Sequence, residues 1–198
     1  VRDNIFDKVF RRSYSDDIHH FVNTEAPAEN AELFEKIKED YKKLEGEYGR
    51  YKGAFAEFVI LSRLRSGAFT ENNRFVSMMK NLPADFEFTE YGNVWSYHSP
   101  PLHEPEFQID IFARAGEDEY SLIGEVKNRK AKFSVKEAAA FREKAGELAR
   151  LENLGKFVLF VFSVSGFYKN TLGYLKKHGI AWSSDKRWLD AAESGVRK

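Results

Sequence analysis

Apolar residues in the first third of the chain recur at helical spacing. Over residues 31–48 they follow one another every three or four positions, which predicts a helix with a charged outer face. Gly46, Gly49 and Gly53 then predict a break or bend. The next stretch, GAFAEFVILSRLRSG, is apolar nearly all round, which is typical of a helix buried on most of its surface, and Gly67 is placed to end it.

Strand patterns account for much of the remaining sequence. FEFTEYGNVWSYH, residues 86–98, alternates and is rich in aromatic side chains, which predicts a strand or a hairpin turned at Gly92-Asn93. Residues 107–115 and 120–128 are joined by a polar turn and predict an antiparallel hairpin. KFVLFVFSV is a continuous apolar run, typical of a central strand buried on both faces, and IAWSS predicts a short final strand.

Two further helices are predicted among these strands. Ser134 and Glu137 have the spacing of a capping box and precede an apolar helical stripe, and another helix is predicted over residues 168–177. The predicted order is helix, three strands, helix, strand, helix, strand. Residues 1–30 mix apolar pairs with charges and end in a polar turn with proline. They predict a short N-terminal helical arm, with residues 31–198 forming the main domain.

Composition limits the classes of function. Lys plus Arg and Asp plus Glu both number 31, so no net charge draws the chain toward nucleic acid or anionic lipid. The absence of cysteine excludes disulfides, thiol nucleophiles and cysteine-based zinc sites. No apolar run is long enough to span a membrane and no signal-peptide pattern is present, so no membrane partner and a cytoplasmic location are expected. The chain begins at Val1, which hints at a fragment of a longer polypeptide.

The predicted hairpin places charged residues inside apolar runs. Asp110 lies in its first strand, and Glu125 and Lys127 lie in its second. Strict alternation would put Asp110 on the opposite face from Ile109 and Ile111, and would put Glu125 and Lys127 on a shared face. The two acids are therefore free to converge at one end of adjacent strands.

This arrangement suits phosphodiester hydrolysis. Two carboxylates so close together repel each other unless a positive group lies between them, and a hard divalent cation accepts carboxylate and backbone oxygens. Mg²⁺ is the expected ion, because it can polarise a phosphoryl group and lower the pKa of an attacking water. Lys127 is placed to orient or deprotonate that water or to neutralise negative charge developing on the phosphate.

Glu57 is the one acid within the apolar second helix. Its helical neighbours at three and four residues are small or apolar, so its carboxylate needs a partner. A metal ion would be one such partner. The alternative is a basic side chain, with Arg63 and Lys52 as the nearest candidates in the sequence.

The motif formed by Asp110 and, fifteen positions later, Glu125-Val126-Lys127 resembles that of the PD-(D/E)XK nuclease superfamily. The resemblance implies a restriction-endonuclease-like α/β/α sandwich with a mixed central sheet of four or five strands. It also implies that Asp110, Glu125, the Val126 carbonyl and Glu57 bind Mg²⁺, with Mn²⁺ as a substitute, and that Lys127 is catalytic. The implied activity is a DNA endonuclease that leaves a 5′-phosphate. The chain departs from the motif at Ile109, where the superfamily has proline, and it lacks the QxxxY feature of exonuclease-like members.

A second resemblance concerns the stretches GEVKNRK and FVFSVSGF. Both are similar to the nuclease-like domain found C-terminal to the P-loop in archaeal-type ATPases, which implies a link to a P-loop ATPase. No GxxxxGK[ST] occurs in this chain. The resemblance leaves open a catalytically inactive, regulatory module that binds nucleic acid or a partner protein.

A run of basic residues begins in the second strand of the hairpin. Over ten positions it contains five basic residues and no acid: Lys127, Arg129, Lys130, Lys132 and Lys136. The run is either a solvated face or a patch that contacts nucleic-acid phosphates beside the acids.

Other interpretations stay open. Asp110, Glu125 and Lys127 also suit a cross-strand salt bridge without chemistry, or a carboxylate-pair glycosidase. His98 and His103 lie in the proline-rich loop before Asp110 and could approach the acids, although loop histidines are more often exposed. Strand aromatics could stack on bases but usually pack in cores. Cleavage of two strands would make a homodimer useful.

Overall fold

The computed structural model describes the backbone of residues 27–190 and the side chains of residues 35–190. Its helices are α3 (Pro27–Ser66), α4 (Asn72–Ser77), α5 (Val135–Leu151), α6 (Lys169–Lys177) and the 3₁₀ helix η1 (Lys186–Trp188). Its strands are β1 (Asn93–His98), β2 (Gln108–Arg114), β3 (Ser121–Lys127), β4 (Phe157–Ser163) and β5 (Ala181–Ser183). Among the described helices, none is long and apolar enough to cross a membrane.

The chain divides into two compact units that meet between Tyr48 and Gly49. In the first unit, the described residues belong to the N-terminal part of α3. The second unit contains the remainder of α3, all the strands and the other helices. The arm predicted for residues 1–30 lies outside the described residues up to position 26, and its last four residues are helical.

Helix α3 is continuous, so the break predicted at its glycines is wrong. A glycine in a helix interior costs only about 1 kcal/mol, far less than proline, and the residues between Gly46, Gly49 and Gly53 are mostly good helix formers. The predicted end of the helix is confirmed. The backbone N–H of Gly67 donates to the Arg63 carbonyl at 2.8 Å, directly after the last helical residue.

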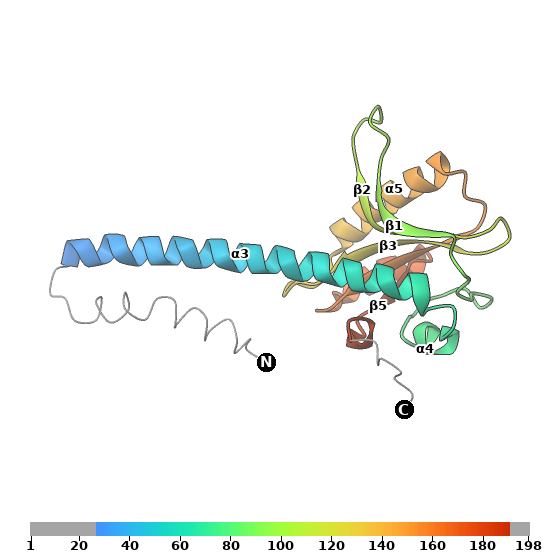
Figure 1. The fold of residues 1–198 in the computed structure, drawn as a ribbon, viewed down its shortest axis with the longest axis horizontal. Helices are drawn as coiled ribbons and strands as arrows, with labels where there is room; N and C mark the ends of the chain where they lie inside the picture. The colour runs from blue at the N-terminus through green and yellow to red at the C-terminus, as the bar shows by residue number, and fades with distance from the viewer. Residues whose placement is uncertain (1–26, 191–198) are drawn as a thin grey trace. The chain divides into compact units, whose positions relative to one another are not determined.

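The strands form one mixed five-stranded sheet with the order β1-β2-β3-β4-β5, as Figure 1 shows in part. β1, β2 and β3 are antiparallel neighbours, whereas β3, β4 and β5 are parallel. The predicted hairpin and the predicted central position of β4 are both confirmed. A mixed sheet of five strands follows from the sequence pattern because the hairpin is local, while the parallel strands are separated by helices.

The strand predicted over residues 86–98 is wrong in its first half, and no hairpin forms at Gly92. The strand begins at Asn93, and the aromatic residues before it are buried outside any strand. Phe86 and Phe88 pack edge to face with ring centroids 5.0 Å apart. The backbone N–H of Phe88 donates to the Asn72 side chain instead of to a neighbouring strand. Core packing therefore explains the alternation here.

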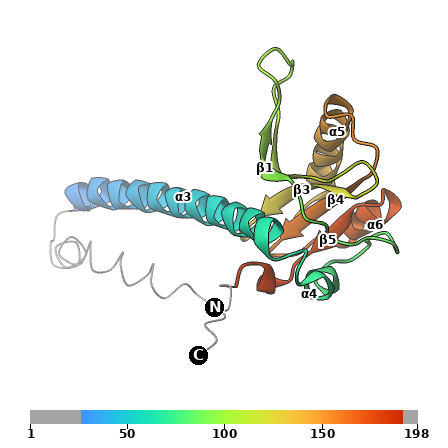
Figure 2. The same ribbon diagram turned by 45° about the vertical axis from the view of Figure 1, so that its right-hand side comes forward.

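Each face of the sheet is covered by helices. On one face, Ala56, Ile60 and Leu64 of α3 and Phe75 of α4 share a buried core with side chains from β2, β3 and β4. On the other face, α5 and α6 pack on the sheet through a second core (Figure 2). The coarse α/β sandwich with helices on both faces is thus confirmed.

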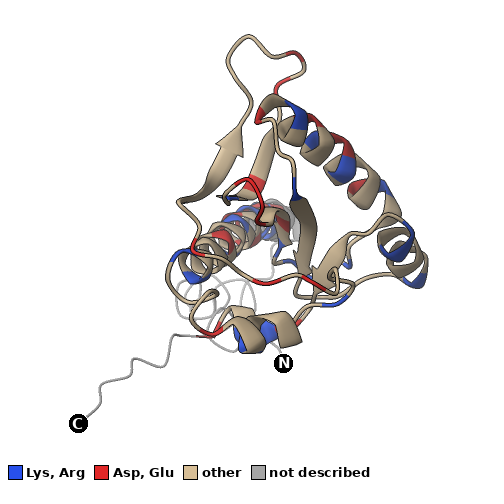
Figure 3. Cartoon of the chain, turned by 90° about the vertical axis from the view of Figure 1, so that its right-hand side faces the viewer, with Lys and Arg blue, Asp and Glu red and all other residues tan. Residues whose placement is uncertain are grey.

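Helix α5 follows its predicted pattern closely. The Ser134 side chain accepts from the Glu137 backbone N–H, and the Glu137 side chain accepts from the Ser134 backbone N–H, which completes the predicted capping box. Alanine and larger apolar residues face the sheet, whereas charged residues of both signs follow the helix on its other positions (Figure 3). The hairpin, the capped helix and the parallel strand follow one another in the sequence, and this order explains why β3 lies between β2 and β4.

Gly124, next to the acids of the hairpin, has little space for a larger side chain. A Cβ placed there would lie 3.1 Å from Ile111 Cβ and 3.1 Å from Ile111 Cδ1, across the β2–β3 pair. We expect Gly124→Ala to lower the free energy of unfolding by about 1–3 kcal/mol, because the core has to shift. The matched control is Gly146→Ala in α5, where a Cβ meets nothing within 4 Å. It should raise stability by about 0.5–1 kcal/mol. Urea unfolding of both variants checks the pair, and equal effects would contradict it.

Candidate functional site

The acids of the hairpin lie where the β2–β3 ladder ends. The last paired residues at this end are Ile111 and Gly124, so Asp110 and Glu125 come next on the two strands. Beyond these paired residues, the Asp110 side chain links the two strands: its Oδ2 accepts a hydrogen bond from the backbone N–H of Val126 at 2.8 Å. Asp110 is therefore held in place by the strand that carries Glu125.

The strict alternation predicted for β2 is wrong at this point. Ile109 packs in the core beneath α5 and α6, whereas Ile111 packs in the core beneath α3 and α4. The reason is a bulge: the β1 partners Trp95 and Tyr97 are two positions apart, but they pair with Phe112 and Ile109, which are three apart. The extra residue redirects the chain beside Asp110.

Lys127 lies between the two acids. Its Nζ is 2.5 Å from Glu125 Oε1 and 3.5 Å from Asp110 Oδ2. The carboxylates of Asp110 and Glu125 are 13% and 14% exposed. These pairs are largely shielded from solvent, unlike an exposed surface salt bridge. The structure thus brings together three of the residues that the sequence singled out.

The shielding changes the proton affinities of these groups. Burial raises the pKa of Glu125, and the nearby Asp110 carboxylate raises it further, against the opposing effect of Lys127. Burial would lower the pKa of Lys127, but Glu125 and Asp110 outweigh it, so the pKa of the ammonium group is raised. Lys127 is therefore firmly protonated near neutral pH.

Glu57 belongs to the same electrostatic cluster. Burial raises its pKa from 4.5 to about 7; Asp110 is the next cause, and Lys127 and Glu125 also act on it. The pairing with Arg63 that the sequence allowed does not occur, because the Arg63 guanidinium donates to the carbonyl of Asp190. No described side chain forms an ion pair with Glu57.

The four side chains form an acidic cluster in which carboxyl groups outnumber ammonium groups. Asp110, Glu125 and Glu57 bring three carboxyl groups, and Lys127 brings one ammonium group. Lys144 of α5 also lowers the pKa of Glu125, but its effect is smaller than those of burial, Asp110 and Lys127. Burial is the main cause of the raised pKa of Glu57, and the excess of nearby carboxylates adds to it.

Two residues that sequence reasoning overlooked help to build the cluster. The Asn128 side chain donates to the Lys52 carbonyl of α3 at 3.0 Å, which ties the end of β3 to the helix that carries Glu57. Lys144 reaches the electrostatic environment of Glu125 from α5. Asn128 directly follows the acid-x-lysine motif, so its position was a usable signal. Lys144 carried none, because helical charges are usually solvated.

The histidines and strand aromatics have other roles. The His103 ring bonds the Pro105 carbonyl through Nδ1 at 3.0 Å and the Glu147 carboxylate of α5 through Nε2 at 2.9 Å. These contacts hold the proline-rich loop against α5. His98 ends β1 and pairs with Gln108. Trp95 packs against Phe112 with ring centroids 4.7 Å apart, as expected for a core residue.

The basic run lies on the surface after β3. Arg129, Lys130, Lys132 and Lys136 are all exposed. Arg129 pairs with the N-terminal carboxylate of α5, Glu137. Lys132 and Lys136 form no ion pair with another described residue, so they are the cations of the run best placed to meet a polyanion.

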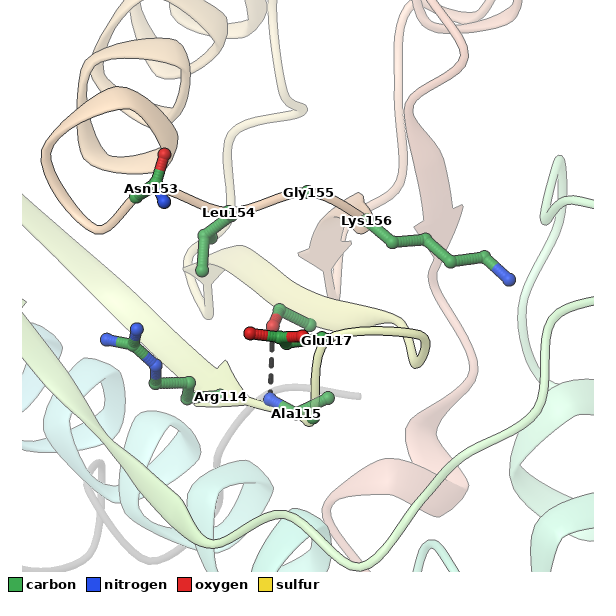
Figure 4. A pocket seen from close by; sticks show the side chains of 9 residues that line it. Arg114, Ala115, Glu117, Asn153, Leu154, Gly155 and Lys156 are labelled. Atoms are coloured by element: carbon green, nitrogen blue, oxygen red, sulfur yellow. Dashed lines mark hydrogen bonds between the residues drawn. The ribbon is translucent and has the colours of Figure 1, made fainter.

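A cavity of about 320 Å³ lies at the opposite end of the β2–β3 pair from the acids. Figure 4 shows it between the β2–β3 turn and the segment before β4. Its cationic side chains already have partners, because Arg114 pairs with Glu152 and Lys156 pairs with Asp85. None of the site residues predicted from the sequence lines this cavity.

The oxygen-only donors of the acidic cluster suit a hard cation such as Mg²⁺. Their present positions do not form a metal site, and within residues 35–190 no group of three His, Asp or Glu side chains is arranged to hold a metal ion. The reason in this cluster is the Lys127 ammonium, which lies between Asp110 and Glu125. A cation would have to move it.

Comparison with known proteins returns no match. No family model fits the sequence, no curated protein shows significant sequence similarity, and no solved structure shows significant structural similarity. The resemblance to PD-(D/E)XK nucleases therefore rests on Asp110, Glu125, Lys127 and the order of elements around them, and it stays a prediction.

The raised pKa of Glu57 predicts a pH-dependent stability. Above pH 4.5 the unfolded chain releases this proton while the folded chain keeps it until about pH 7, so stability falls over that window. Glu57→Gln removes the effect. Without divalent ions, the variant should match the parent near about pH 5 and exceed it by on the order of 2 kcal/mol near about pH 8, after allowance for solvent screening.

Denaturant unfolding at both pH values measures this difference. The control is Glu87→Gln, which alters an exposed glutamate outside the cluster and should shift stability equally at both pH values. A variant of Glu57 that gains nothing at the higher pH would show that its carboxyl group is not held protonated.

Proposed function

We propose that the chain is a divalent-metal-dependent nuclease, an endonuclease acting on DNA, with a restriction-endonuclease-like fold. The observation that carries the proposal is the charge imbalance of the acidic cluster, in which three carboxyl groups share one ammonium group. A structural salt bridge would be balanced by one acid for each base. A site that binds a dication and then a phosphate needs the excess of acids.

In this proposal Asp110, Glu125 and Glu57 supply carboxylate ligands, and Val126 supplies its backbone carbonyl. A bound Mg²⁺ or Mn²⁺ ion polarises the phosphoryl group and lowers the pKa of a water. The hydrogen bond from the Val126 N–H fixes one oxygen of Asp110, so this carboxylate is oriented before any ion arrives. Asn128 keeps α3, and with it Glu57, against the end of β3.

Lys127 is assigned its role as a cation. A lysine ammonium group is a poor general base near neutral pH, but it is a good partner for phosphate oxygens that gain negative charge during attack. We therefore assign Lys127 to stabilising that charge. A glycosidase is less well supported, because an ammonium group between the two acids takes the place of a sugar ring.

Cleavage of supercoiled plasmid tests the proposal. With Mg²⁺ or Mn²⁺ the parent should nick the plasmid, and Asp110→Ala and Lys127→Ala should each lower the rate at least about 100-fold, because each removes charge that acts on the phosphate. The matched control is Lys156→Ala, which breaks an exposed Lys–Asp pair with Asp85 elsewhere on the domain and should cleave like the parent.

Cleavage that survives either site substitution would overturn the mechanism. If the parent cleaves no duplex, junction or single strand, the chain is better described as a nuclease-like module that binds nucleic acid or protein. In that case Asp110→Ala should leave DNA binding unchanged or improved.

Lys132 and Lys136 are proposed to contact the DNA backbone beside the cluster. Both are exposed, and neither forms an ion pair with another described residue. Lys132→Ala with Lys136→Ala should weaken duplex binding about equally for all sequences and lower the slope of log affinity against log salt by about 2, one for each phosphate contact. Fluorescence anisotropy over a salt series measures the slope. Lys169→Ala with Lys177→Ala in α6 is the charge-matched control, and an equal change in slope there would contradict a local patch.

A further inference from the structure

The outward face of the C-terminal part of α3 is apolar and exposed. Tyr51, Phe55 and Phe58 have 69%, 49% and 63% of their surface exposed. The Tyr51 and Phe55 rings stack with centroids 6.5 Å apart and an interplanar angle of 17°. In the same turns the charged residues are Lys52 and Glu57. At about 100° per residue, both lie roughly a quarter turn or more from the centre of the three rings.

These rings have no place in the core of their own unit. Ala56, Ile60 and Leu64 form the buried face of the helix, and the aromatic stripe lies on the opposite side. The largest apolar patch of a soluble protein, commonly about 300–600 Å², is often a functional surface. Its position opposite the core therefore indicates a contact with another molecule.

The chemistry of the stripe identifies the kind of partner. Nucleic acid would need cations beside the rings to contact its phosphates, and the stripe has none at its centre. The cores of protein–protein interfaces are rich in aromatic residues and poor in charge. The geometry points to a second copy of this chain, paired with the first through the aromatic stripe of Tyr51, Phe55 and Phe58 on α3.

Self-pairing agrees with the spacing of the stripe. The rings follow at four and three residues, as in a coiled-coil seam. At these exposures the three rings offer on the order of 300 Å² on each copy. The rest of the roughly 800 Å² that each partner buries in a standard interface would come from side chains around the stripe. An uncharged surface also meets its own copy without burying an unpaired charge.

The mass of the full chain in solution tests this inference independently of any cleavage. Sedimentation equilibrium of the parent over a dilution series should give twice the monomer mass. Phe58→Glu should weaken self-association at least about 100-fold, because each dimer would bury two carboxylates. The matched control is Phe69→Glu, which changes a phenylalanine of similar exposure, 53%, that lies beyond the end of α3. It should leave the dimer intact, and circular dichroism should show that both variants stay folded.

Because the chain has no cysteine, single cysteines can locate the contact. Phe55→Cys or Phe58→Cys should form a disulfide-linked dimer on mild oxidation, whereas Phe69→Cys should not. A parent that stays monomeric throughout the dilution series would overturn the inference. So would a dimer that Phe58→Glu and Phe69→Glu weaken equally, or one that crosslinks only at position 69. None of these outcomes bears on whether the acidic cluster cleaves DNA.

Discussion

The organisation of the domain around β3 depends on one shielded ion-pair triad, in which the Lys127 ammonium contacts Glu125 and Asp110. Two partly buried carboxylates on adjacent strands would force the strands apart without it. The third acid, Glu57, is affected as well, because burial and the nearby Asp110 carboxylate raise its pKa to about 7. A helix, two strands and their connections are thus constrained by the charge balance of four side chains.

The elements around the triad explain why it can be held at the end of a sheet. The bulge in β2 releases the ladder beside Asp110, and the carboxylate then accepts the Val126 N–H that the ladder would have used. Gly124 keeps β2 and β3 close just before this point. Asn128 joins the strand end to α3 just after it. The backbone irregularity is therefore compensated on both sides of the charged residues.

Local signals predicted most of the fold. The capping box at Ser134, the hairpin and the continuous apolar strand each rest on neighbours in the sequence, and all three occur. The wrong predictions concern residues whose structure is determined by contacts with parts of the chain that are distant in the sequence. Phe86 and Phe88 alternate like a strand but are fixed by other aromatic side chains, and the bulge in β2 depends on pairing with β1. The gathering of acids was foreseeable from spacing, whereas the protonation of Glu57 needed its burial beside them.

The same triad sets the order in which a nuclease of this kind would have to work. With no dication bound, Lys127 satisfies Glu125 and Asp110, which keeps the acids from repelling each other. A dication held by these carboxylates would displace the ammonium group, which, like any lysine side chain, would remain a cation near neutral pH. The displaced charge would then be available to a phosphate bound at the ion. One lysine would then balance the two acids before the ion binds and stabilise negative charge on the substrate afterwards.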